Sequence, residues 1–203
     1  MEPFLASLDR LAISGAIIKG GKEPTGPTDA LHVRVAVRCM LYLGLREEEA
    51  LEMKWRGFSP DFKTYIPGDT KGYEAVVLPV PESVRPLLVI LKERRIDGCM
   101  WVLPRPDGEP HYRQFTRKYI EAAGEEIGIQ NLTPHRMRGT CATLLARAGM
   151  SAHLIKKHLR HKTLETAIKY VQIIEDDLRD AQNKAFQISP TPVPQKNMPS
   201  KNE

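Results

Sequence analysis

The stretch from Ala30 to Leu43, ALHVRVAVRCMLYL, is apolar on nearly every side when it is drawn as a helix. Such a helix has to be covered by other elements, so it predicts the centre of a globular core. Gly44 follows directly and is the residue type that most often ends a helix. The 203 residues of the chain are enough to build a sizeable core around it in one domain with appendages.

Around this segment, apolar spacing and turn residues predict an α+β fold that is mostly helical, with a small three-stranded antiparallel sheet. The three strands are expected within residues 54–81, separated by turns at Ser59–Asp61 and at the PGDTKGY segment. The further helices are expected over residues 1–18, 82–95 and 111–127, in a short segment after Arg46, and after the capping residues Thr133, Ser151 and Thr163.

Composition divides the chain into three parts. Residues 1–29 are predicted to be an N-terminal helix followed by a Gly- and Pro-containing linker. Residues 30–187 are predicted to form the main domain. Residues 188–203, ISPTPVPQKNMPSKNE, are rich in proline and polar side chains, so they are predicted to be a disordered tail.

Positive charge is concentrated in one part of the chain. The net charge is +5 and the isoelectric point about 9.1. Residues 131–170 hold one acidic residue, Glu165, four histidines and eight Lys or Arg: Arg136, Arg138, Arg147, Lys156, Lys157, Arg160, Lys162 and Lys169. Such a stripe is typical of proteins that bind the phosphate backbone of nucleic acids. A surface that is basic only for solubility would not need the histidines.

The three cysteines, Cys39, Cys99 and Cys141, are scattered and lack paired metal spacing, which favours a reduced, cytoplasmic setting. No run of about 18 apolar residues exists, so no membrane span is expected. The N-terminus also lacks the basic start and the long apolar stretch of a signal peptide.

The TPHRMR motif at residues 133–138 places two candidate functional groups on one helical face. Thr133 suits the N-cap and Pro134 the first helical position. His135 and Arg138 are three residues apart, beside helix amides that attract anions. The motif alone is also typical of a solvated basic turn. Further along, Tyr170 lies roughly 100° from the apolar stripe of the last helix, at the edge of the packed face.

These residues and their order resemble the catalytic domain of tyrosine recombinases, the phage integrase family. That family has the order Arg, Lys, His-x-x-Arg, His or Trp, and Tyr. The match covers about residues 30–175 and assigns residues 30–187 to a catalytic domain. The matching positions are Arg46 and Glu49 in LGLREEEAL, Lys71 in the predicted hairpin, His135 and Arg138 in TPHRMR, His161 in LRH, and Tyr170.

Two positions depart from the family pattern. The family usually has Leu-Gly-His where this chain has Leu159-Arg160-His161, and it often has a second His where this chain has Gly139. Neither position carries a catalytic group in that pattern. Arg160 nevertheless lies in the turn that orients His161.

The resemblance implies a site-specific recombinase or integrase that cleaves and rejoins DNA through a 3′-phosphotyrosyl intermediate. Arg46 and Arg138 would hold the phosphate, and Tyr170 would attack it. Of the remaining groups, His135 would accept the tyrosine proton or bind the phosphate, His161 would donate a hydrogen bond, Lys71 would protonate the leaving 5′-oxygen, and Glu49 would orient the His and Arg groups.

No metal, ATP or other cofactor is expected, because the arginines take the place of a metal. The expected partners are double-stranded DNA and further protomers, which would form a tetramer on DNA from a monomer or weak dimer in solution. No membrane partner is expected, and a bacterial protein of this kind would be associated with the nucleoid. Candidate DNA contacts are Arg136, Lys156, Lys157, Arg160 and Lys162.

Alternatives remain at this point. The chain could be a DNA-binding module of the same fold without cleavage activity, or an enzyme similar to type IB topoisomerases. A metal-dependent nuclease would need an acidic cluster, which the sequence lacks. Lys63 competes with Lys71 for the lysine position. Full-length members of the family generally carry an N-terminal core-binding domain, whereas only about 30 residues precede the matching part here.

Overall fold

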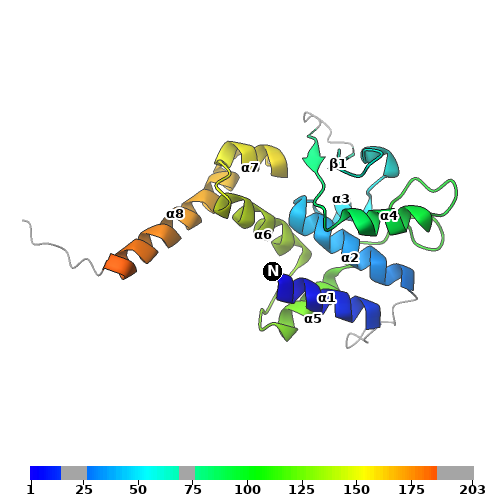
Figure 1. The fold of residues 1–203 in the computed structure, drawn as a ribbon, viewed down its shortest axis with the longest axis horizontal. Coiled ribbons are helices and arrows are strands. Elements are labelled where there is room, and N and C mark those ends of the chain that lie inside the picture. Colours follow the sequence, from blue (N-terminus) through cyan, green and yellow to red (C-terminus); the bar gives the residue numbers. More distant parts are fainter. Residues whose placement is uncertain (15–26, 69–75, 187–203) are drawn as a thin grey trace, which may run out of the picture.

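The computed structural model describes residues 1–14, 27–68 and 76–186 (Figure 1). These residues form helices around a central helix, with a small sheet at one side. In chain order the elements are α1 (Glu2–Ser14), α2 (Pro27–Tyr42), α3 (Glu47–Leu51), a 3-10 turn (Trp55–Gly57), β1 (Thr64–Tyr65), β2 (Leu78–Pro79), α4 (Arg85–Glu93), α5 (Arg117–Glu126), α6 (Pro134–Arg147), α7 (Ala152–Leu159) and α8 (Leu164–Phe186).

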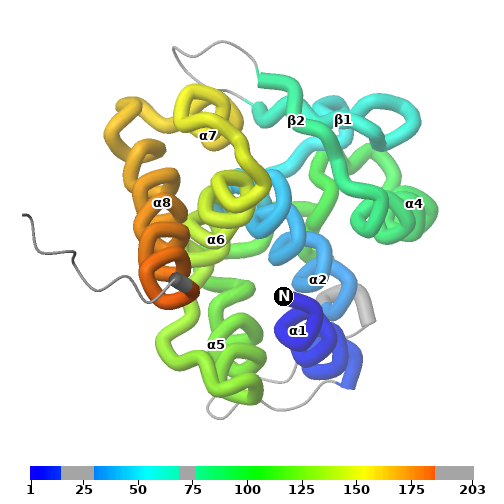
Figure 2. The backbone as a smooth tube through the Cα atoms, turned by 60° about the vertical axis from the view of Figure 1, so that its left-hand side comes forward, coloured from blue at the N-terminus to red at the C-terminus, as the bar shows by residue number. Residues whose placement is uncertain are grey.

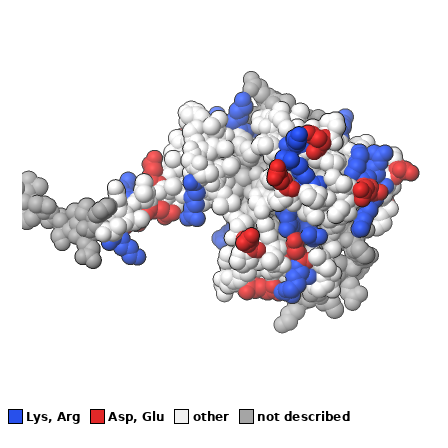
Figure 3. Space-filling view, in the orientation of Figure 1, with Lys and Arg blue, Asp and Glu red and all other residues white. Residues whose placement is uncertain are grey.

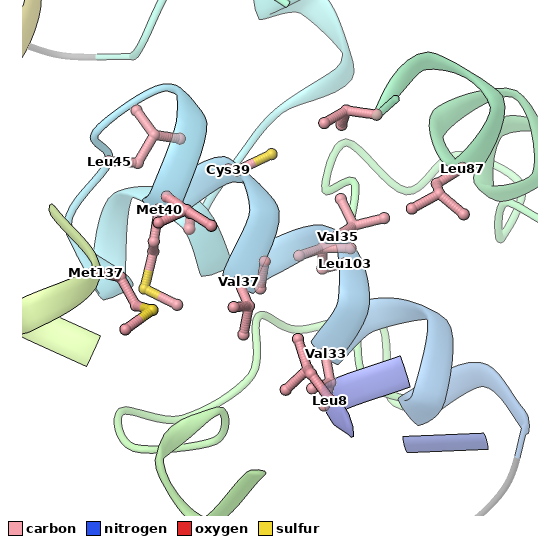
Figure 4. Packing of buried hydrophobic residues seen from close by; sticks show 14 of the residues in the cluster. Leu8, Val33, Val35, Val37, Cys39, Met40, Leu45, Leu87, Leu103 and Met137 are labelled. Atoms are coloured by element: carbon pink, nitrogen blue, oxygen red, sulfur yellow. The ribbon is translucent and has the colours of Figure 1, made fainter. Parts of the chain in front are cut away.

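The central helix is α2, and its predicted burial is confirmed. Val33, Val35, Val37 and Met40 are fully buried, and α2 contacts α1, α3, α4 and α6. Figure 4 shows these side chains together with Leu8, Leu103 and Met137 from other parts of the chain. The apolar core therefore packs around α2, as its sequence requires.

Helix α1 shares this core. Helix α1 contacts α2 and α5, and its apolar side chains Phe4, Leu5, Leu8, Leu11 and Ala12 are buried in the core. Asp9 reinforces the contact, because Arg38 Nη1 of α2 donates to Asp9 Oδ1 at 2.7 Å. The two arginines that face Asp9, Arg38 and Arg34, outweigh the effect of burial and lower the pKa of its carboxyl group.

The sheet differs from the prediction, because among the described residues it has two strands rather than three. Residues 64–65 pair antiparallel with residues 78–79, so that Tyr65 lies opposite Leu78. The expected first strand instead forms the 3-10 turn at 55–57, and Phe58 makes only a single bridge to Tyr65. The chain reverses immediately afterwards at Ser59, whose amide donates to the Thr64 carbonyl, so no length remains for a third strand.

A second apolar cluster joins α6, α7 and α8, which lie side by side (Figure 2). Its buried members are Cys141, Ala142, Ala146, Ile155, Leu159 and Ala167. Helix α8 then continues away from the rest of the molecule (Figure 1), and residues 175–185 are exposed on all sides. None of the described helices is long and apolar enough to cross a lipid bilayer. The predicted tail, 188–203, and residues 19–26 of the predicted linker lie outside the described residues. The linker prediction was wrong for residues 27–29, which form the start of α2.

Candidate active site

The first part of the site is the short segment between the end of α2 and the start of α3. Arg46 is the N-cap residue of α3, and its amide donates to Glu49 Oε2 at 2.8 Å. Its side chain also turns to the same residue, since Arg46 Nη1 donates to Glu49 Oε1 at 2.7 Å. The Arg46 side chain remains 53% exposed. The pair predicted from LGLREEEAL is therefore in direct contact, with the arginine open to solvent.

Arg138, by contrast, is buried. Its Nη1 donates to the Gly44 carbonyl at 2.6 Å, and its Nη2 donates to the Leu159 carbonyl. Gly44 adopts a left-handed conformation with φ +61°, and a Cβ there would lie 2.1 Å from Leu159 Cδ2. Glycine at position 44 therefore allows the end of α2, helix α6 and the end of α7 to meet at the guanidinium of Arg138.

The turn between α7 and α8 carries Arg160 and His161. Arg160 has φ 54° and ψ 45°, the left-handed conformation that glycine adopts most easily, and it is the C-cap of α7. Its side chain is only 3% exposed, and Nη2 donates to Glu49 Oε2 at 2.6 Å. The amide of His161 donates to the Lys156 carbonyl at 3.0 Å. This turn is thus held to α3 and to α7 at the same time.

Tyr170 lies on α8 beside His161. The two rings are nearly parallel at 23°, with centroids 6.4 Å apart. The Tyr170 hydroxyl oxygen lies 3.7 Å from the position that a Cβ on Gly139 would take, so it lies over α6. His135 precedes Gly139 by one helical turn and is exposed on the same face. Tyr170, His161 and the TPHRMR segment therefore converge at one place.

The charges of this cluster affect its titratable groups. Burial lowers the pKa of His161 to about 4, helped by the nearby guanidiniums, chiefly that of Arg138. Burial also lowers the pKa of Arg138 to about 10, with Arg46 and Arg160 acting in the same direction. At neutral pH His161 is therefore uncharged and Arg138 is charged. The Nδ1 atom of His161 is buried and makes no hydrogen bond to the described residues.

Glu49 is the single acidic group in contact with these described arginines. Burial alone would raise the pKa of its carboxyl group, but Arg160 and Arg46 outweigh that effect and lower it. Glu49 Oε2 also lies 3.8 Å from Arg138 Nη1. The predicted orienting role of Glu49 therefore has a geometric basis, because its carboxylate faces three guanidiniums.

The candidate DNA contacts divide into two groups. Arg136, Lys157 and Lys162 are exposed, and Lys156 is half-buried. Arg160 is turned inward to Glu49, so its guanidinium does not lie on the surface. On the face shown in Figure 3, lysines and arginines lie beside acidic side chains on the right-hand part and along the projecting helix, and much of the remaining surface is uncharged.

The predicted lysine, Lys71, lies outside the described residues. The competing Lys63 lies in the turn before β1, where its Nζ is 3.1 Å from Asp61 Oδ2. The sequence did not single out Gly44 as part of the site. Its position directly after the buried helix was the available signal, because a left-handed glycine at a helix end exposes the last carbonyls of that helix.

Two guanidiniums and a histidine gathered next to a tyrosine on the last helix define the catalytic-domain class of tyrosine recombinases. The comparison with family models agrees: the Phage integrase family model matches residues 18–176, so the chain belongs to that family. The predicted resemblance is confirmed.

Curated relatives include the tyrosine recombinases XerA of Saccharolobus solfataricus and Thermococcus kodakarensis. The first is 28% identical over 162 residues, which are 79% of this chain and 53% of the relative. The second is 26% identical over 155 residues, which are 75% and 55% of the two chains. The chain thus spans about half the length of these relatives.

Solved structures show the same fold. The XerH site-specific recombinase in its post-cleavage complex with the palindromic difH substrate superimposes with a TM-score of 0.69 at 22% identity, covering 90% of this chain and 50% of XerH. The catalytic domain of bacteriophage HP1 integrase gives a TM-score of 0.57 at 18% identity, covering 85% of each chain.

Proposed function

We propose that this chain is the catalytic part of a site-specific DNA recombinase that cleaves and rejoins DNA through a 3′-phosphotyrosyl intermediate. The observation that carries the proposal is the approach of Tyr170 to His161 and to α6, next to the cluster of Arg46 and Arg138. Membership of the phage integrase family supports the same activity.

In the proposed reaction the Tyr170 oxygen attacks the phosphorus of a DNA phosphodiester. The bond from phosphorus to the tyrosine oxygen forms, and the bond to the 5′-oxygen breaks. The tyrosine proton passes to His135, which lies one helical turn from the residue under the hydroxyl. The leaving 5′-oxygen takes a proton from Lys71, as the family pattern implies. Attack by a 5′-hydroxyl on the phosphotyrosine reverses these steps and joins strands without ATP.

Arg46 and Arg138 would bind the non-bridging oxygens and stabilise the negative charge that develops on them. His161 is neutral in the free protein, so it holds one ring N–H to donate to a phosphate oxygen. A phosphate bound there would favour the protonated ring and would raise the pKa of His161.

Assembly belongs to the same proposal. Ile173 and Leu178 on α8 are 48% and 65% exposed, although both are apolar. In the tetramer proposed to form on DNA, the projecting half of α8 would pack on a neighbouring protomer and cover such groups. Without DNA the protein is expected to be a monomer or weak dimer, and in bacteria it would associate with the nucleoid in the cytoplasm.

The test uses a pool of DNA duplexes of random sequence, each with a nick that lets the short 5′-hydroxyl fragment diffuse away after cleavage. The wild-type chain should form a covalent adduct that survives denaturation, and sequencing the captured DNA would identify the target. Tyr170→Phe should bind DNA but form no adduct. Tyr112→Phe is the matched control, because Tyr112 is 67% exposed and lies before α5.

An adduct that persists in Tyr170→Phe would assign the nucleophile to another residue. Binding by the wild-type chain without any adduct would support the alternative, a DNA-binding module of this fold that does not cleave. If the protein forms the adduct and relaxes supercoiled DNA but exchanges no strands between duplexes, the topoisomerase-like alternative would be favoured.

A further inference from the structure

Arg160 differs from the other basic residues of the α7–α8 region. It keeps a left-handed backbone, φ 54° and ψ 45°, where a side chain is strained and glycine is not. Its guanidinium is buried, donating from Nη2 to Glu49 Oε2 at 2.6 Å and from Nη1 to the His158 carbonyl at 3.1 Å. An arginine at this position therefore has a specific partner inside the site.

That partner, Glu49, is shared with the two arginines proposed to bind phosphate. Glu49 Oε1 accepts from Arg46 Nη1 at 2.7 Å. Oε2 accepts from the Arg46 amide and from Arg160 Nη2, and it lies 3.8 Å from Arg138 Nη1, beyond hydrogen-bond distance. Without Arg160, this oxygen would lose one of its two donors, so it would pair with Arg138 and compete with the phosphate for it.

We propose that Arg160 is a positioning residue of the active site, which holds the Glu49 carboxylate and offsets its charge, so that Arg46 and Arg138 remain available to the scissile phosphate. The inference rests on the proposed function. It assigns a role to the residue that replaces the glycine of the family's Leu-Gly-His turn.

The charges explain why such a role would act on the cleavage step. Three guanidiniums face one carboxylate, which leaves a net charge of two positive units in the cluster. A phosphodiester carries one negative charge, and the five-coordinate species formed when a phenolate attacks it carries two. The charge of Arg160 therefore complements the transition state more than the bound DNA, and should affect the rate more than the affinity.

The backbone on both sides of Arg160 has contacts of its own. Arg138 binds the carbonyl of Leu159, and the amide of His161 binds the carbonyl of Lys156. Substitution of the side chain should therefore leave the turn folded. Thermal unfolding of each variant would check this directly.

The experiment compares three variants in single-turnover cleavage of the captured nicked duplex, with DNA affinity measured by mobility shift. Arg160→Met removes the charge but keeps an unbranched side chain, Arg160→Lys keeps a charge, and Arg160→Gly removes both charge and strain. Met and Gly should slow adduct formation at least about tenfold with affinity within about twofold, and Lys should recover part of the rate. Arg117→Ala is the control, because it removes an exposed Arg–Glu pair within α5, with Glu121 at 2.7 Å.

A double-mutant cycle with Glu49→Gln tests the pairing itself. The cleavage defects of Arg160→Met and Glu49→Gln should be non-additive, and so should their effects on urea unfolding without DNA. Three outcomes would each overturn the inference and leave the proposed function intact. They are cleavage at the wild-type rate by Arg160→Met, losses of DNA affinity and cleavage rate that are equal, and coupling with Glu49→Gln that is seen in unfolding but not in cleavage. A wild-type chain that forms no adduct would overturn the proposed function and the role of Arg160 with it.

Discussion

The rings of His161, which precedes α8, and Tyr170, which lies within it, are nearly parallel at 23°, with centroids 6.4 Å apart. Their positions have different origins. His161 is fixed by the turn after α7, whereas Tyr170 is placed by α8, which packs through Ala167 on the second apolar cluster. The geometry of the proposed nucleophile therefore depends on how α8 is seated as much as on the groups around it.

The low pKa of His161, about 4, should make stability depend on pH. In the unfolded chain a histidine takes up a proton near pH 6.5, whereas in the native protein this ring stays neutral. Between about pH 6.5 and 4 the unfolded state binds the extra proton, so stability falls as the pH falls. His161→Asn should show a shallower fall in the free energy of unfolding by urea over this range. Equal slopes for both proteins would contradict the depressed pKa.

Arg138→Lys should abolish most of the activity without removing the charge. A lysine cannot reproduce the forked contact to the Gly44 and Leu159 carbonyls, nor the two-pronged grip on a phosphate. We expect adduct formation to slow by well over tenfold, more than about 1.4 kcal/mol of barrier. Single-turnover cleavage measures this, with Arg117→Lys as the control. Near-normal cleavage would mean that Arg138 only supports the backbone.

Gly44→Ala should be strongly destabilising. Its Cβ would collide with Leu159 Cδ2 at 2.1 Å, and its φ of +61° would be strained as well. Gly149→Ala is the matched control: its φ is +84°, but nothing lies within 4 Å of the added Cβ. We expect the control to lose about 1 kcal/mol from backbone strain alone, and Gly44→Ala to lose about 1–3 kcal/mol more from overpacking. Urea unfolding measures the free energy lost by each variant, and equal losses in Gly44→Ala and Gly149→Ala would refute the collision with Leu159.

Leu178→Glu tests the assembly surface on α8. This side chain is 65% exposed and lies beyond the part of α8 that packs on the second cluster. We expect its DNA-free mass by light scattering to be unchanged, while the slower-migrating assemblies on DNA decrease in a band-shift assay. Gln182→Glu adds the same charge one turn later at an exposed polar position, so it should have little effect. If Leu178→Glu and Gln182→Glu lose the slower-migrating assemblies equally, the cause is the added charge rather than the lost apolar contact.

Much of the fold and of the site was predictable because it depends on local patterns. The buried helix around Val35 followed from its apolar sides, and the cap at Thr133 followed from the TPHRMR motif. The contact between Arg46 and Glu49 also follows from spacing, because residues three apart in a helical turn face each other.

The remaining features depend on contacts between distant segments. The first of the three strands was predicted before the turn at Ser59–Asp61, but the chain reverses at Ser59 and Phe58 makes only one bridge, to Tyr65. Arg160 was predicted as a candidate DNA contact within the basic stripe of residues 131–170. Its burial follows from the left-handed turn and from Glu49, which is 111 positions earlier in the chain.

That separation has a consequence for synthesis of the chain. A ribosome completes Arg46 and Glu49 long before it reaches Arg160, and Arg138 must span 94 positions to bind Gly44. Contacts of such range form late in folding. Under the proposed mechanism, a product interrupted before residue 160 lacks the nucleophile and the closed arginine cluster together. Under that mechanism, unfinished chains cannot become covalently attached to DNA.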